Sequence, residues 1–134
     1  KLLKINNETN IVSAHRTPER MFKYAKSAEK NNSSVIIAGA GGSAHLRGMI
    51  ASLTRLPVSG VPIESKKLKG LSMLLSIAQM PKGIPVGTVA IGIDGAINAA
   101  LYAASIISTF DDSVKNNLNK WRSKQSKSVK KKPK

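Results

Sequence analysis

Residues 34–45 read SVIIAGAGGSAH, so a short β-branched run stands directly before a glycine-rich loop and a histidine. Such a run, bounded by small and turn-forming residues, is typical of a buried strand, and a helix-length segment follows it at 43–54. Glycines at 41 and 42 let the backbone approach a ligand closely. The stretch therefore predicts a strand, a ligand-binding loop and a helix, in that order.

The same alternation runs through the chain. Strands are predicted at 10–13, 34–38, 56–63 and 85–91, and helices at 18–30, 43–54, 68–80, 95–108 and 112–124. Pro18 suits the first turn of its helix, which Thr17 is expected to cap. Apolar strands that alternate with helices predict an α/β fold: a three-layer sandwich with a parallel sheet, flavodoxin-like or Rossmann-like, plus a C-terminal helix.

Length and composition limit the class of protein. A chain of 134 residues suits one domain, and it has no run of 18 apolar residues and no signal-peptide pattern in its first ten. The absence of cysteine excludes disulfides and thiolate metal sites. We expect a soluble, cytoplasmic protein that does not enter a membrane.

The net charge of +15 is concentrated at the end of the chain. Residues 113–134 hold nine Lys or Arg and no acid, and 125–134 is expected to be a basic, disordered tail. Trp121 is the only aromatic residue near it, so the tail has no series of stacking platforms for bases, and we do not expect nucleic acid as a partner. The mildly basic remainder suits a small phosphorylated substrate.

Both histidines of the chain follow predicted strands. His15 comes directly after the strand at 10–13, and His45 ends the glycine-rich loop after the strand at 34–38. Ligands of open parallel sheets bind outside the carboxyl ends of the strands. A single histidine there is most often a hydrogen-bonded loop residue, but two at equivalent positions favour a functional site.

The glycine loop also has a second interpretation. GAGGSA at 39–44 matches the pattern G-x-G-x-x-A, and Glu64 lies at the end of the next predicted strand, where a ribose-binding acid is expected in a dinucleotide site. The same glycines equally suit a mononucleotide or a small heteroaromatic ring, so these residues alone leave the ligand open.

Five blocks in order resemble one enzyme family, the class I 5-(carboxyamino)imidazole ribonucleotide mutases of purine biosynthesis. They are SAHRTPERMFKYA (13–25), VIIAGAGGSAHLRGMIAS (35–52), LPVSGVPIESKKLKG (56–70), LLSIAQMPKGIPVGTVAIG (74–92) and GAINAALYAASII (95–107). Animal-type relatives, which carboxylate aminoimidazole ribonucleotide directly, have SAHKGP-like and AGRSNG-like segments instead. The resemblance covers residues 11–107 and favours the mutase.

The resemblance implies a reaction and a site. The substrate loses its carbamate as carbon dioxide, and the neighbouring ring carbon then recaptures the gas, with no metal or nucleotide cofactor. His15 matches the proton-shuttling histidine, and the ordinary pKa of imidazole, about 6.5, suits that task. Arg16 matches the phosphate-binding position. The residues expected to enclose the imidazole and carboxylate are Gly41, Gly42, Ser43, Ala44 and His45, and Ser13, beside this loop, is also expected to bind the substrate.

The resemblance also implies an assembly and a division of the chain. Family members form octamers with sites at subunit contacts. Residues 1–110 are expected to form the mutase domain, and 111–124 a helix whose Leu118 and Trp121 reach a neighbouring subunit.

Departures from the family pattern predict that this chain is less active than its relatives. Members begin with a strand and a GSxSD-like phosphate loop, which nothing before Ile11 contains, so the chain is expected to be a fragment of a longer one. Without that strand, two others are expected to lack their partner. Arg47, where proline is usual, is expected to put a cation near the pocket, and Ser72 replaces an expected carboxylate. The alternative is a catalytically silent assembly subunit.

Overall fold

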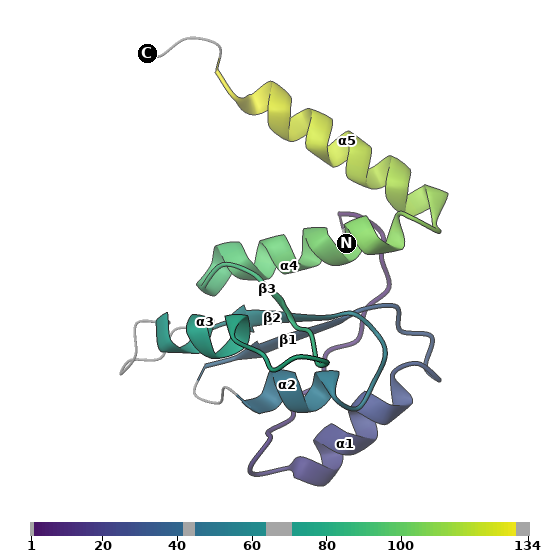
Figure 1. Cartoon of the computed structure of the whole chain (residues 1–134). Coiled ribbons are helices and arrows are strands. Elements are labelled where there is room, and N and C mark those ends of the chain that lie inside the picture. The colour runs from purple at the N-terminus through teal and green to yellow at the C-terminus, as the bar shows by residue number, and fades with distance from the viewer. Residues whose placement is uncertain (1, 42–44, 64–70, 131–134) are drawn as a thin grey trace. The chain divides into compact units, whose positions relative to one another are not determined.

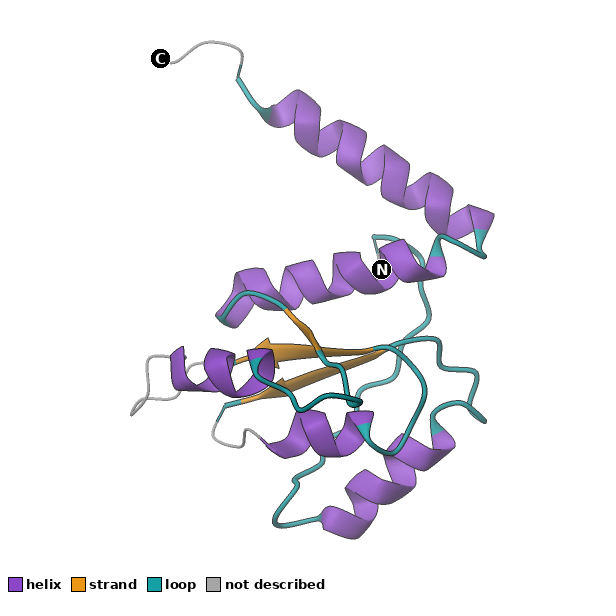
Figure 2. Ribbon diagram, viewed as in Figure 1, coloured by secondary structure: helices purple, strands orange, loops and turns teal. Residues whose placement is uncertain are grey.

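The structure is a computed structural model that describes residues 2–41, 45–63 and 71–130. Figure 2 shows the alternation of helices and strands along the chain. Residues 9–103 form one compact unit, and residues 1–8 with 104–134 form a second. The elements, in order, are α1 (Pro18–Ser27), β1 (Ile36–Ala40), α2 (His45–Ala51), β2 (Val58–Pro62), α3 (Leu71–Ala78), β3 (Gly87–Thr88), α4 (Gly92–Ile107) and α5 (Asp112–Ser128).

The sheet of the first unit has three parallel strands in the order β1-β2-β3. Its longer ladder pairs Ile36 with Val58 and continues to Ala40 with Pro62, whereas β3 pairs only at Gly87 and Thr88. Parallel neighbours need crossover connections, which α2 and α3 supply. The predicted parallel sheet is therefore confirmed, and its carboxyl ends lie at one edge.

Helices cover both faces of this sheet. A Cβ atom built on Gly60 would lie 2.9 Å from Cδ of Arg47 in α2 and 3.0 Å from Cγ2 of Ile77 in α3, so α2 and α3 share one face. A Cβ atom on Gly87 would lie 3.4 Å from Cε1 of Tyr102, which places the part of α4 around Tyr102 on the other face (Figure 1). The three-layer α/β prediction is confirmed.

The core lies between β1 and the helices α1 and α2. Met21 and Ala25 of α1 and its C-cap residue Ala28 are spaced by four and three positions, which places them on one side of that helix. Removal of this apolar surface from water is the main favourable term that holds the helix on the unit. The buried set is Ala14, Met21, Ala25, Ala28, Ile36, Ala38, Leu46, Ile50 and Val58.

The strand predicted at 10–13 is wrong, because these residues pair with no strand. A cavity of about 240 Å³ separates residues 9–12 from β1, and it is lined from both sides. A strand needs a ladder of hydrogen bonds to a neighbouring strand, and residues 10–13 belong to no ladder of the described sheet. Ile11 is 86% exposed as a result.

The other predicted strands and helices are present, but they begin or end at different residues from those predicted. The strands lie at 36–40, 58–62 and 87–88 instead of 34–38, 56–63 and 85–91, since only the paired residues form the ladder. Helix α1 stops at Ser27 and α2 at Ala51, whereas α4 begins at Gly92 and α5 continues through Ser128 instead of ending at 124. Residues 43, 44 and 68–70, which belong to two predicted helices, lie outside the described residues.

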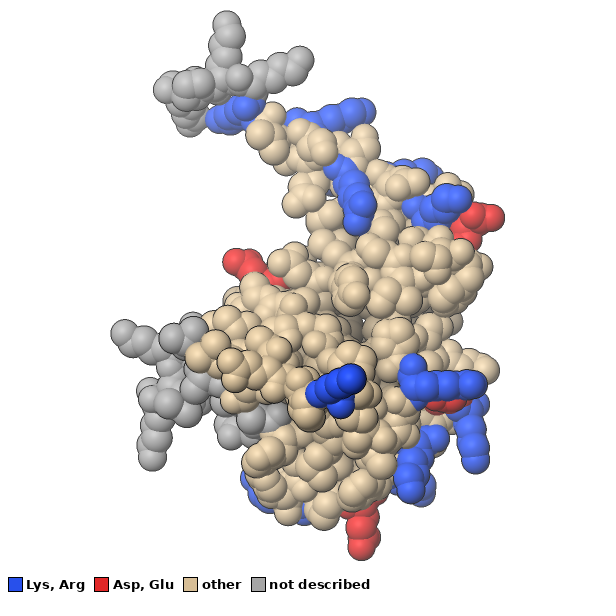
Figure 3. Space-filling model, in the orientation of Figure 1, with Lys and Arg blue, Asp and Glu red and all other residues tan. Residues whose placement is uncertain are grey.

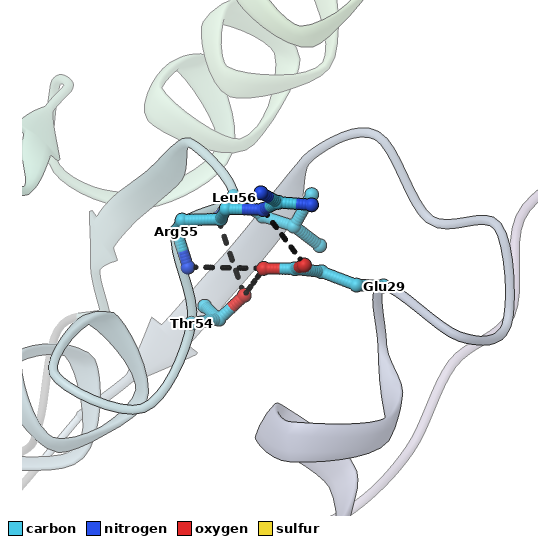
Figure 4. Close-up of polar contacts among 4 residues, drawn as sticks. All are labelled: Glu29, Thr54, Arg55 and Leu56. Atoms are coloured by element: carbon cyan, nitrogen blue, oxygen red, sulfur yellow. Dashed lines mark hydrogen bonds and ion pairs between the residues drawn. The ribbon is translucent and has the colours of Figure 1, made fainter.

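Glu29, just after α1, binds the segment before β2 through hydrogen bonds and an ion pair (Figure 4). Its Oε1 accepts hydrogen bonds from the Arg55 amide and the Thr54 hydroxyl, each at 3.1 Å, and its Oε2 accepts from Arg55 Nε at 2.9 Å. The Arg55 amide is the largest cause that lowers the pKa of this carboxyl below its ordinary value of 4.5, against partial desolvation. The ionised form of Glu29 therefore stabilises the fold.

Replacement of Glu29 by glutamine is expected to lower the melting temperature at pH 7, because an amide cannot reproduce the charged bonds to Arg55. A depressed carboxyl pKa contributes stability that is complete above the unfolded value of 4.5 and is lost as pH falls through the folded value. Thermal melts at pH 7 and pH 3 test this. An equal deficit at both pH values would contradict the electrostatic origin.

The second unit contains α5 and the first residues of the chain. The Asp111 carboxylate caps α5 by accepting a 3.0 Å bond from the Val114 amide, and Val114 and Leu118 are buried. Asn117 Nδ2 donates to the Leu3 carbonyl at 3.3 Å. Lys and Arg side chains are spread along the exposed surface of α5 (Figure 3). None of the described helices has the length and apolar character needed to span a membrane.

Candidate active site

A tight turn between Ser13 and Thr17 holds His15 and Arg16. The Ser13 amide donates to Thr17 Oγ1 at 2.8 Å, while that hydroxyl and the Thr17 amide donate to the Ser13 carbonyl at 3.3 and 3.1 Å. The Arg16 amide donates to Ser13 Oγ at 3.2 Å. The prediction that the Thr17 side chain caps α1 is wrong, because its hydroxyl closes this turn instead.

The two histidines come together at this site. Nδ1 of His45 lies 3.4 Å from Nε2 of His15, and the rings meet edge to face, with centroids 5.6 Å apart and planes inclined by 81°. His45 is the first residue of α2, five positions beyond the end of β1. Both side chains are exposed. The prediction that both lie on one edge of the sheet is confirmed.

This arrangement suits proton transfer. Of the two facing nitrogens, one must carry the hydrogen and the other accept it, and the tautomer decides which. The second nitrogen of each ring lies outside this contact. An imidazole can therefore exchange a proton with a ligand while its neighbour fixes the ring orientation. The pair has the parts needed for general acid–base chemistry.

The other predicted site residues surround the pair unevenly. Ser13 and Gly41 are half-buried, and Arg16 is exposed, with no ion pair among the described residues. A Cβ atom on Gly41 would meet the Ile63 carbonyl oxygen at 3.5 Å, an ordinary contact, so the fold tolerates a side chain there. The predicted residues Gly42, Ser43 and Ala44 lie outside the described residues.

Arg47 lies at the same edge, but it is buried. Its side chain is 1% exposed, and Nη2 donates to the carbonyl of Ala40 and, at 3.2 Å, to that of Val61. Burial lowers the pKa of the guanidinium by desolvation. The sequence contained a signal for this position, because Arg47 precedes the core residue Ile50 by three positions and so shares its side of α2.

The dinucleotide interpretation loses its structural context. Gly39, the first glycine of the G-x-G-x-x-A pattern, lies inside β1 and pairs with Val61, whereas a dinucleotide motif places it in the turn after the strand. Glu64, its expected ribose ligand, lies outside the described residues. The described residues hold no cluster of three or more His, Asp or Glu arranged for a metal ion.

Comparison with known proteins decides the family. The family model described as AIR carboxylase matches residues 1–128. The chain belongs to the AIR carboxylase family.

Relatives of this AIR carboxylase family member are close in sequence. The chain is 54% identical over 129 residues to the N5-carboxyaminoimidazole ribonucleotide mutase of Escherichia coli K12, with 96% of the chain and 76% of that protein covered. It is 57% identical over 119 residues to the mutase of Pyrococcus abyssi, covering 89% of the chain and 67% of the relative. A bifunctional purine synthesis protein of Dictyostelium discoideum is 57% identical over 122 residues, which are 91% of the chain and 12% of that protein.

Proposed function

We propose that this chain catalyses the mutase reaction of purine biosynthesis, from 5-(carboxyamino)imidazole ribonucleotide to 4-carboxy-5-aminoimidazole ribonucleotide. The observation that carries the proposal is the contact between His15 and His45 at the carboxyl edge of the sheet, in a chain that belongs to this family. The mutase names of its relatives support the choice of substrate.

The proposed reaction has two steps, a decarboxylation and a carboxylation, with no net gain or loss of protons. First the carbamate N–C bond breaks, its electron pair stays on the amine nitrogen, and the nitrogen takes a proton from His15 as carbon dioxide leaves. Then the neighbouring ring carbon attacks the carbon dioxide, and His15 takes the proton that this carbon loses. One group thus gives and regains a proton, which an imidazole does well near neutral pH. His45 is proposed to orient the His15 ring.

The proposal is tested by incubating the purified chain with 5-(carboxyamino)imidazole ribonucleotide and measuring the 4-carboxy product by chromatography. We expect conversion well above the rate without protein. The reverse reaction, started from the 4-carboxy compound, should reach the same equilibrium mixture. Failure in both directions, with retained ribonucleotide binding, would overturn the assignment as a mutase.

Arg16 is proposed to bind the phosphate of the ribonucleotide. Its replacement by alanine is expected to raise KM by about 10-fold or more with a smaller change in kcat, because a phosphate contact acts in the ground and transition states alike. Steady-state kinetics measure the two constants separately. An Arg20→Ala variant, which removes an exposed arginine of α1, serves as the charge control. A loss confined to kcat in Arg16→Ala would contradict the phosphate role.

The alternative function is a catalytically silent assembly subunit. Calorimetry with aminoimidazole ribonucleotide separates the two, since a silent subunit should bind the ribonucleotide weakly or not at all. NAD serves as a further comparison ligand. A ligand at a hundred times its dissociation constant adds about 2.7 kcal/mol of stability, which a thermal shift detects. Stabilisation by NAD and none by the ribonucleotide would favour the dinucleotide interpretation.

We also propose that the chain forms a homo-oligomer, an octamer as in the family, in the cytoplasm. The support is an apolar strip on α4, where Ile93 is 79% and Ile97 50% exposed, together with exposed Ala96 and Ala100. Leu118, expected to contact a neighbour, is instead buried within its own chain, while Trp121 is half-buried. Light scattering of the wild type and an Ile97→Lys variant measures the mass. A wild-type monomer would contradict the proposal.

A further inference from the structure

The side chain of Arg47 bonds α2 to the carboxyl ends of two strands. Its Nη2 donates to the carbonyl of Ala40, the last residue of β1, and at 3.2 Å to that of Val61, the residue before the last of β2. The stem of the arginine packs on Gly60, where a Cβ atom would lie 2.9 Å from Cδ of Arg47. One side chain of α2 thus reaches both strands, and it does so where β2 has room for it.

Stability alone does not account for an arginine at this position. The side chain is 1% exposed, and its Nε and Nη1 are buried with no hydrogen-bond partner among the described residues. The ion pairs of the described residues join Glu29 to Arg55 and Asp112 to Lys115, so neither involves Arg47. A buried cation without an anionic partner costs free energy, and an apolar side chain of similar volume is often as stable or more stable.

The bonds of Arg47 fix the turn of α2 that carries His45. His45 begins this helix two residues before Arg47, and its Nδ1 lies 3.4 Å from Nε2 of His15. Leu46 and Ile50 bury the helix in the core, but apolar contacts are non-directional. Hydrogen bonds weaken steeply when their distance or angle changes. The directional contacts from Arg47 therefore define where the first turn of α2 lies along the strand ends.

We propose that Arg47 is a positioning residue, whose bonds to the ends of β1 and β2 hold His45 in contact with His15. The catalytic consequence rests on the proposed function, in which His45 orients the His15 ring. Arg47 acts through His45 and needs no contact with the substrate. A displacement of about 1 Å at a catalytic group can cost about 100-fold in rate. We expect Arg47→Met to lower kcat by about 10- to 100-fold and to leave KM within about 2-fold.

Nuclear magnetic resonance tests the positioning role without any substrate. The chain has two histidines, so two sets of imidazole signals are expected, and His15→Asn assigns them. A nuclear Overhauser effect between the two rings reports their contact. It is expected in the wild type, absent from Arg47→Met, and weakened in Arg47→Lys, since an ammonium keeps the charge without the planar fork. The matched control is Ile50→Val, which removes one buried methylene from the same helix. It should lower the melting temperature but keep the ring contact and kcat.

The outcomes separate a positioning residue from a structural one. Arg47→Met should melt no lower than the wild type, because it removes a buried charge. A ring contact as strong in Arg47→Met as in the wild type, or absent from the wild type, overturns the proposal, and so does an unchanged kcat. If Arg47→Met does not fold, Arg47→Lys decides, and a ring contact of full strength there overturns the proposal. If the wild type converts no ribonucleotide, the proposed function fails, and the ring contact alone decides the role of Arg47.

Discussion

His15→Asn is expected to bind the ribonucleotide nearly as well as the wild type while losing its interconversion. Asparagine keeps a polar side chain of similar reach but has no nitrogen that titrates near neutral pH. General acid–base catalysis typically contributes about 100- to 10,000-fold in rate, so kcat should fall within that range. Single-turnover kinetics and calorimetry on the same preparation separate chemistry from binding.

The control for this experiment is His45→Asn. If His45 orients the His15 ring through the 3.4 Å contact between Nδ1 and Nε2, its loss should lower kcat less than the loss of His15 and shift the pH profile of kcat. Near-normal turnover of His15→Asn would remove His15 from the mechanism, and His45 would become the candidate shuttle.

Much of the fold follows from periodicity, because the apolar runs at 34–38 and 56–63 are long enough to define buried strands. Periodicity does not reveal whether a run has a neighbour with which to pair. Residues 10–13 have the composition of a strand, yet they face a cavity next to β1 and form no ladder. Composition is local, whereas pairing depends on segments distant in the chain.

The candidate site was predictable to a similar degree. The sequence placed His45 beyond the carboxyl end of a real strand, β1, but it placed His15 at the same edge from a predicted strand at 10–13 that does not form. The contact with His45 is what brings His15 to this edge. The sequence did not indicate that the rings make contact, since that depends on the turn that Thr17 closes with Ser13. The sequence also did not predict that Arg47 is buried. Arginine is rarely buried, and this general preference outweighs the spacing of three positions between Arg47 and Ile50.

The second large effect concerns Gly95, a buried glycine in the first turns of α4. A Cβ atom there would overlap the carbonyl oxygen of Ala90 and lie 2.6 Å from its carbonyl carbon. Both atoms belong to the backbone, so no side chain can rotate away, and the connection from β3 to α4 must move. We expect Gly95→Ala to destabilise the fold by about 3 kcal/mol or more, measured by urea denaturation.

The sign of this effect makes it a sharp test, because replacing a glycine by alanine inside a helix ordinarily stabilises it by about 1 kcal/mol. Gly48 in α2 provides the matched control. A Cβ atom at Gly48 would lie 3.0 Å from Cε of Met80, the far end of a flexible side chain that rotates at little cost. Gly48→Ala should therefore leave the free energy of unfolding unchanged or raise it, whereas Gly95→Ala should lower it. If both substitutions stabilise the chain, Gly95 does not lie against the Ala90 carbonyl. The segment between β3 and α4 would then follow a different course from the one described.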